Sequence, residues 1–92
     1  AIVVESMADG GVACGLPRAS AIQYAAQMML GTAKMVLETG QHPGVLKDSV
    51  CSPAGSTIQG VQTLEKCGMR AAVFDAVTVA YEKNVELKKA SD

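Results

Sequence analysis

Aromatic side chains are scarce in this sequence, which has one Phe, two Tyr and no Trp among its 92 residues. So few rings cannot form a surface on which nucleic-acid bases stack. Positive charge is not in excess either, because eight Lys and Arg face nine Asp and Glu, for a net charge of −1. Without rings or a basic field, the sequence argues against nucleic-acid binding.

Disulfide and metal patterns are missing as well. The three cysteines, Cys14, Cys51 and Cys67, form no CxxC pair, and their odd number and wide spacing do not suit a disulfide framework. The single histidine, His42, has no second His or Cys at a zinc-ligand spacing. We expect no metal site, and free thiols in the reducing cytoplasm.

The sequence also lacks long apolar runs and a signal peptide. Gln27, Lys34 and Asp75 interrupt the longest apolar stretches, so none reaches the length of a membrane span. Glu5 lies where a signal peptide would be basic. We expect no membrane association. Because the chain starts without Met and inside an apolar pattern, we also expect it to be a piece of a longer protein.

What the sequence does have is apolar surface, since 49% of its residues are hydrophobic. A single domain of this size buries only about 60–65% of the surface that its unfolded chain exposes. Between Ala19 and Leu37 the only charge is Lys34. A helix that is apolar nearly all round must be buried nearly all round. The sequence therefore predicts an intertwined homodimer, in which small residues such as Gly31 let backbones approach.

Helical periodicity, punctuated by Gly and Pro, predicts an all-α fold with five helices. They are expected over residues 1–14, 17–39, 43–50, 56–66 and 69–89, with residues 90–92 fraying. Gly15 is expected just past the first helix and Pro17 in the first turn of the second. Gly10 and Gly11 lie inside the first helix at a cost of about 1 kcal/mol each, so a close-packed neighbour is expected there.

Catalytic and nucleotide-binding fingerprints do not occur. The sequence has no GxGxxG, GxxxxGK[ST], HExxH or GxSxG motif, so it cannot by itself bind a dinucleotide in a βαβ unit. His42 would have to activate Ser49, Ser52 or Ser56 for serine-type hydrolysis. Because His42 directly precedes Pro43, we expect it to cap a helix or face solvent.

The segment from Val50 to Thr57 has a composition that suits anion binding. It places two hydroxyls, a glycine and unpaired backbone N–H groups at the start of the helix expected from Ser56. Such helix ends hold carboxylates and phosphates, and Gly55 would let a ligand approach the main chain. The alternative is a plain N-cap, in which Ser52 or Ser56 satisfies its own helix. Composition alone leaves both open.

A series of short motifs runs over almost the whole chain, and the HPGxLKDxVxSP run that starts at His42 is highly specific. The other motifs are Asp9-Gly10-Gly11-Val12, Gly15-Leu16-Pro17-Arg18, Ala25-Ala26-Gln27, Gly31-Thr32-Ala33-Lys34-Met35, Leu37-Glu38-Thr39-Gly40, Ser52-Pro53-Ala54-Gly55-Ser56-Thr57-Ile58, Leu64-Glu65, Gly68 and Arg70-Ala71-Ala72-Val73. In these motifs and in their order, the sequence resembles pyrroline-5-carboxylate reductase.

This resemblance implies that residues 1–92 are the C-terminal helical dimerisation domain of such a reductase, without the Rossmann domain that would precede it. The family reduces Δ1-pyrroline-5-carboxylate to L-proline with NADPH or NADH, in the last step of proline biosynthesis. Its C-terminal helices interlock in a homodimer, and its dimers often form larger rings. The alternative is a helical oligomerisation module with no catalytic activity of its own.

The resemblance also implies roles for individual residues. The family's SPGGTT segment holds the carboxylate of the small-molecule substrate, which assigns that role to Ser52, Gly55, Ser56 and Thr57, with the N–H groups of Ser56 and Thr57 as donors. Thr57 also corresponds to the position proposed to give a proton to the ring nitrogen. Ser49 and Val50 match positions near the nicotinamide half of the cofactor.

Two residues depart from the SPGGTT pattern: Ala54 replaces a glycine and Ser56 replaces a threonine. Ser56 keeps its hydroxyl and its N–H. The extra methyl group of Ala54 is tolerable if the backbone φ angle stays negative there. We expect the carboxylate site to survive.

Overall fold

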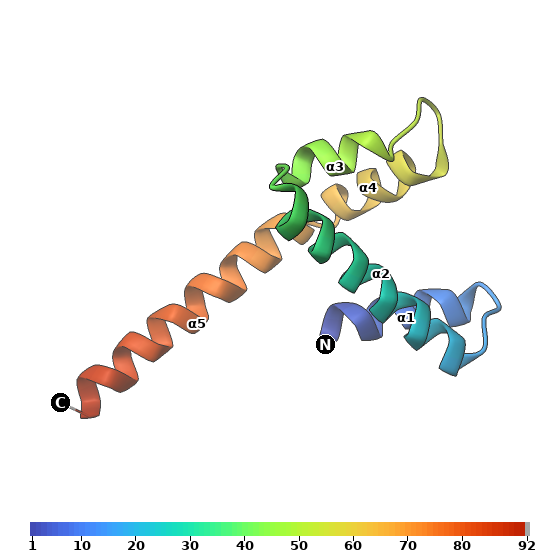
Figure 1. Ribbon diagram of the computed structural model, residues 1–92. Coiled ribbons are helices and arrows are strands. Elements are labelled where there is room, and N and C mark those ends of the chain that lie inside the picture. Colours follow the sequence, from blue (N-terminus) through green and yellow to red (C-terminus); the bar gives the residue numbers. More distant parts are fainter. Residues whose placement is uncertain (92) are drawn as a thin grey trace. The chain divides into compact units, whose positions relative to one another are not determined.

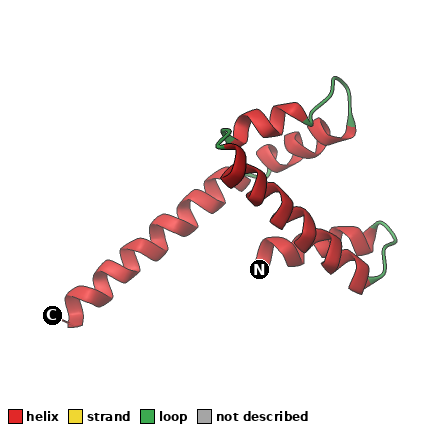
Figure 2. Cartoon of the chain, in the orientation of Figure 1, coloured by secondary structure: helices red, strands yellow, loops and turns green. Residues whose placement is uncertain are grey.

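The computed structural model describes residues 1–91 and consists of five α-helices, with no strand in that range (Figures 1 and 2). The helices are α1 (Ile2–Ala13), α2 (Arg18–Thr39), α3 (Pro43–Ser49), α4 (Ser56–Lys66) and α5 (Met69–Ser91). The all-α prediction is confirmed, and the expected boundaries hold to within two residues. The chain divides into two compact units, Ala1–Lys47 and the part that starts at Asp48.

In the first unit, α1 and α2 form a helical hairpin closed by a short corner (Figure 1). The N–H of Leu16 donates to the carbonyl of Gly11 and that of Gly15 to the carbonyl of Val12, both at 2.9 Å. Together with a φ of +107° at Gly15, this is the Schellman end expected after α1. Pro17 lies at the N-cap of α2 (φ −60°, ψ 144°), one position before the predicted first turn.

The two glycines inside α1 have different surroundings. A Cβ on Gly11 would lie 3.2 Å from Leu16 Cδ1 and 3.3 Å from Ala21 Cβ, whereas one on Gly10 would have nothing within 4 Å. The close packing predicted for this pair is therefore found at Gly11. At Gly10 the chain itself supplies no such neighbour, so the prediction stays open for a second chain.

This difference gives a matched pair of substitutions. Gly10→Ala should stabilise α1 by about 1 kcal/mol because alanine loses less entropy in a helix. Gly11→Ala gains the same but pushes the buried Ala21 and with it α2, so we expect the two free energies of unfolding to differ by about 2 kcal/mol. Chemical denaturation of both variants measures the difference. Equal destabilisation by both would mean that a second chain packs against Gly10.

Glycines in the left-handed region end two further helices. α2 stops at Gly40 (φ +68°), whose N–H donates to Val36 O at 3.0 Å. In the second unit, α4 ends before Gly68 (φ +76°), where α5 begins. Glycine adopts this conformation without the clash that a Cβ introduces.

The helix α5 is longer than the sequence predicted. Fraying was expected from Ala90, but α5 continues to Ser91, and Asp92 lies outside the described residues. Lys88 and Lys89 are in its last turn, where positive charge offsets the partial negative charge of the helix end. An ion pair between Lys83 and Glu86 at 3.7 Å adds local support one turn earlier.

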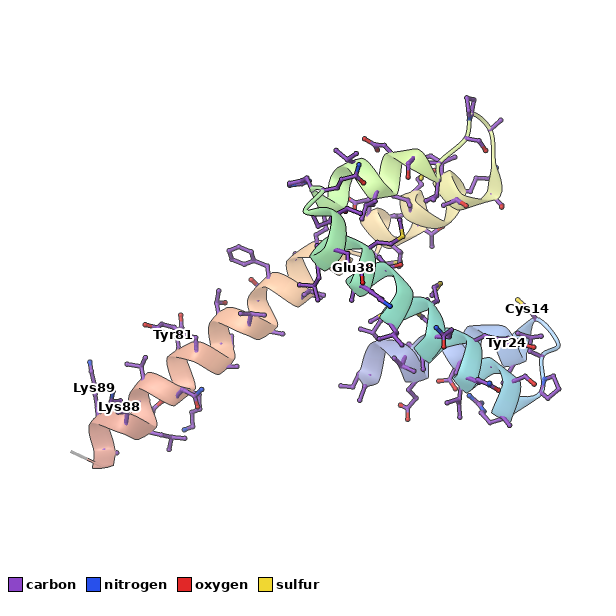
Figure 3. All side chains as sticks on the ribbon, in the orientation of Figure 1. Cys14, Tyr24, Glu38, Tyr81, Lys88 and Lys89 are labelled. Carbon is purple, nitrogen blue, oxygen red and sulfur yellow. The ribbon has the colours of Figure 1, made fainter. Side chains whose placement is uncertain are left out.

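The chain by itself has a very small core. Among the described residues, the buried hydrophobic side chains are three alanines, Ala8, Ala21 and Ala25. Large apolar residues are exposed instead, including Leu30 (61%) and Leu37 (85%) on α2. On α5, Phe74, Val77 and Tyr81 are each about two-thirds exposed, and Figure 3 shows side chains projecting all round this helix. The surface predicted to be buried in a homodimer is thus open in one chain.

Candidate functional site

A tight turn precedes α4 in the Val50–Thr57 segment (Figure 1). The N–H of Gly55 donates to the carbonyl of Ser52 at 3.1 Å, which closes a four-residue turn with Pro53 and Ala54 at its centre. The φ angle of Ala54 is +58°. Proline at the second position and a positive φ at the third are the features of a type II turn.

The condition of a negative φ, under which the extra methyl group of Ala54 is tolerable, is therefore not met. Proline fixes the second turn position at a negative φ, and closing a type II turn then rotates the third residue into the left-handed region. Glycine suits that position, and alanine is strained there by roughly 1–2 kcal/mol. The sequence carried the signal, since proline followed by one residue and a glycine between two helices is a turn pattern.

The first turn of α4 has no side-chain cap. Gly55 is the N-cap residue (φ −79°, ψ 170°), and no side-chain hydrogen bond caps the helix in the described structure. The plain-cap interpretation, in which Ser52 or Ser56 caps α4, is therefore wrong. Since the turn uses the Gly55 N–H, the N–H groups of Ser56, Thr57 and Ile58 are left without partners inside the helix. They give this end of α4 its positive potential.

The side chains around this helix end are accessible. Ser52, Ser56 and Thr57 are exposed and Gly55 is half-buried. A Cβ on Gly55 would lie 2.5 Å from Ser52 Oγ and 3.2 Å from Ser52 O, so the absence of a side chain lets Ser52 sit against the helix start. The structure thus brings the four predicted carboxylate-binding residues together on one turn and one helix end.

The predicted cofactor-contacting pair lies next to this turn in the chain. Ser49 is the last residue of α3, and Val50 follows it in the connection to Ser52. Helix α3 was expected to include Val50, which instead lies in a turn. Both residues are exposed, Val50 at 62%.

His42 caps α3, which is the first of the two roles expected for it, a helix cap or a solvent-facing residue. Its Nδ1 accepts the N–H of Gly44 at 2.9 Å, and its carbonyl accepts the N–H of Val45 at 2.9 Å. An imidazole nitrogen that accepts a helix N–H is not free to take a proton from serine. The structure therefore gives no support to serine-type hydrolysis through His42.

Two exposed ion pairs lie at the corners between helices. Arg18 Nη1 lies 2.5 Å from Asp9 Oδ1, between α2 and α1. Arg70 Nε donates to Glu65 Oε1 at 2.6 Å across the corner between α4 and α5, and this hydrogen bond raises the pKa of Arg70. Both pairs are exposed, so each contributes little to stability.

Other candidate sites are few. All three cysteines are free, as predicted. No group of His, Cys, Asp and Glu that could hold a metal ion occurs within residues 1–91, and no helix in this range combines the length and apolar character needed to cross a membrane. An open hollow of about 540 Å³ lies on the first unit, and it contains none of the predicted site residues; it is lined by Ala1, Val4, Glu5, Ala8, Asp9, Arg18 and Ile22.

Comparison with known proteins identifies relatives along nearly the whole chain. The family model described as pyrroline-5-carboxylate reductase dimerisation matches residues 1–87. The pyrroline-5-carboxylate reductase of Escherichia coli (strain K12) is 57% identical over 86 residues, covering 94% of this chain and 32% of that protein. The enzyme of the same name from Methanosarcina acetivorans is 59% identical over 87 residues, covering 95% of this chain and 32% of that protein.

Solved structures give the same result. The crystal structure of Plasmodium falciparum pyrroline carboxylate reductase with NADP bound is similar with a TM-score of 0.84 and 36% identity, over 89% of this chain and 31% of that one. The 1-pyrroline-5-carboxylate reductase of Streptococcus pyogenes has a TM-score of 0.78 and 36% identity, over 82% of this chain and 29% of that one.

The chain spans about a third of the length of these relatives, 32% in the case of the Escherichia coli protein. Within that third, the match runs through both helical units and through the turn before α4. Because the family model matches residues 1–87, nearly the whole chain, the chain belongs to the pyrroline-5-carboxylate reductase dimerisation family.

Proposed function

We propose that residues 1–92 are the C-terminal dimerisation domain of an NAD(P)H-dependent pyrroline-5-carboxylate reductase, which makes L-proline in the last step of its biosynthesis. The observation that carries the proposal is the uncapped start of α4 behind the Ser52–Gly55 turn. It provides an open set of N–H donors on the residues that match the family's carboxylate-binding segment.

The substrate carboxylate takes the place of the missing cap. The N–H groups of Ser56 and Thr57 donate to its oxygens, and the positive end of α4 favours the negative charge. The exposed hydroxyls of Ser52 and Ser56 supply further donors. The missing side chain of Gly55 lets Ser52 lie against the helix start, beside these donors.

Thr57 is the proposed catalytic residue. Addition of a hydride to the imine carbon turns the C=N bond into an amine, and the ring nitrogen must then gain one proton. A hydroxyl held at this nitrogen by the first turn of α4 gives the proton a defined path and recovers its own from solvent. The exposed position of Thr57 keeps that path connected to water.

The described residues fit only one end of the cofactor. NADPH or NADH, when bound, supplies the hydride and its electron pair. The exposed Ser49 and Val50 can contact the nicotinamide ring, one by a hydroxyl and one by an apolar surface. Residues 1–91 contain no strand and hence no βαβ unit for the pyrophosphate, so we assign that part of the site to a Rossmann domain.

The proposed assembly is an interlocked homodimer in the cytoplasm, with rings of dimers as a further level. Its support is the series of large apolar side chains that α2 and α5 leave exposed, as surfaces that bind another protein do. The free cysteines suit a reducing compartment. We propose neither nucleic acid nor a membrane as a partner, because the chain has a net charge of −1 and few aromatic rings.

The experiment compares the 92-residue chain with the full-length protein that contains it. We expect the short chain to be a dimer by analytical ultracentrifugation and to oxidise no NAD(P)H, because it cannot hold the cofactor. The full-length protein should reduce pyrroline-5-carboxylate. A folded, dimeric full-length protein without turnover would favour the alternative function, an oligomerisation module with no activity.

A further inference from the structure

Ala54 is the one described residue other than glycine whose φ angle is positive, at +58°. The three other positive φ angles belong to Gly15, Gly40 and Gly68, which end helices. An L-amino acid with a Cβ populates this region poorly, whereas glycine enters it freely. The turn before α4 therefore requires a left-handed conformation at Ala54, which alanine disfavours.

Little in the described structure holds Ala54 in this conformation. Ser52, Pro53 and Ala54 are exposed, and one hydrogen bond, from Gly55 N–H to Ser52 O at 3.1 Å, closes the turn. The helix that follows has no side-chain cap. A strained residue that neither packing nor a cap supports is free to leave the left-handed region, and the turn opens when it does.

The same turn decides whether the N–H donors of α4 are presented as a set. When it is closed, Ser52 lies against Gly55 and the first turn of α4 points its N–H groups outward. An anion bound there supplies the cap that the chain lacks, so it stabilises the closed turn. A ligand that binds one of two states has its apparent affinity reduced by the fraction of protein in the other state.

We propose that Ala54 is a positioning residue that sets the fraction of closed turn in the free protein and thereby its affinity for the substrate carboxylate. This inference rests on the proposed function. It concerns the left-handed preference of residue 54, since the side chain of Ala54 touches no reacting atom in this scheme. Once the ligand is bound the turn is closed in every variant, so the rate of the chemical step is the same.

A series of substitutions at residue 54 tests this in the full-length protein. Ala54→Gly should lower KM for pyrroline-5-carboxylate and the Kd for the product L-proline about fivefold, and Ala54→Asn about threefold, because Gly and Asn tolerate the left-handed region. Ala54→Val should raise both about threefold, since β-branched residues avoid it. We expect kcat to stay within about twofold throughout, as for a change in uniform binding.

The Asn variant separates backbone preference from side-chain size. A site that merely lacks space would bind more weakly with Asn than with Ala, which is the opposite order. Thermal melting supplies the second control. If Ala54→Gly raises the melting temperature while KM and Kd stay the same, the fold already holds the turn closed and the inference is wrong. Absence of turnover in the unsubstituted full-length protein would instead overturn the proposed function.

Discussion

Replacing Thr57 by alanine in the full-length protein should lower kcat about 100-fold and leave the dimer intact. The expected loss is at the lower end of what a positioned proton donor contributes. The Thr57 side chain is exposed in the described chain, so removing its hydroxyl creates no cavity. Steady-state NAD(P)H oxidation measures the change, and sedimentation checks the assembly.

The same helix provides a matched control. The Oγ1 of Thr63 donates to the carbonyl of Gln59 at 3.1 Å, one turn or more away from the helix start. Thr63→Ala should therefore leave kcat unchanged, while Thr57→Ser, which keeps a hydroxyl, should retain most of the activity. If Thr57→Ala has wild-type kcat, Thr57 has no catalytic role and serves only as the second residue of α4.

The second large effect is expected at Leu30, in the middle of α2. Its side chain is 61% exposed in the single chain. Leu30→Glu should raise the dissociation constant of the dimer at least about 1,000-fold, because association would bury an unpaired carboxylate. Glutamate is a good helix former, so the effect does not come from loss of α2 itself. Analytical ultracentrifugation over a range of concentrations measures it.

Gln23→Glu is the control for Leu30→Glu, since it adds the same charge to the same helix at a position that is already polar and exposed. We expect that variant to remain dimeric. A Leu30→Glu protein that sediments as a dimer at micromolar concentration would show that this part of α2 lies outside the contact between chains.

The helices could be predicted from sequence because their signals are local. The start of α4 at Ser56 and its end at Lys66 follow from a 3.6-residue period bounded by Gly55 and Gly68. The end of α5 was harder to predict from the sequence. Its last turn depends on how Lys88 and Lys89 interact with the helix end, which is a small energy that sequence patterns do not resolve.

The backbone of the Val50–Thr57 segment could not be predicted from the sequence. Serine and glycine before a helix suggest an anion site and a plain cap equally well, and the structure excludes only the cap, because no side-chain hydrogen bond caps α4. The φ angle of Ala54 could not be obtained from the family pattern, because it depends on which type of turn Pro53 begins. The contacts between two copies of the chain could not be predicted either. Periodicity identifies the apolar face of a helix, but not the residues of the second chain that pack against it.

Among the described residues the chain buries only three alanines of its own, so the proposed dimer would supply most of the buried apolar surface. Folding and dimerisation are then a single equilibrium, and the melting temperature should rise with protein concentration. Dilution below the dissociation constant of the dimer then unfolds the chains as well as separating them. When a destabilised variant pairs with an unaltered chain, the unaltered chain supplies part of the variant's buried surface. The loss of stability is then shared by the two chains.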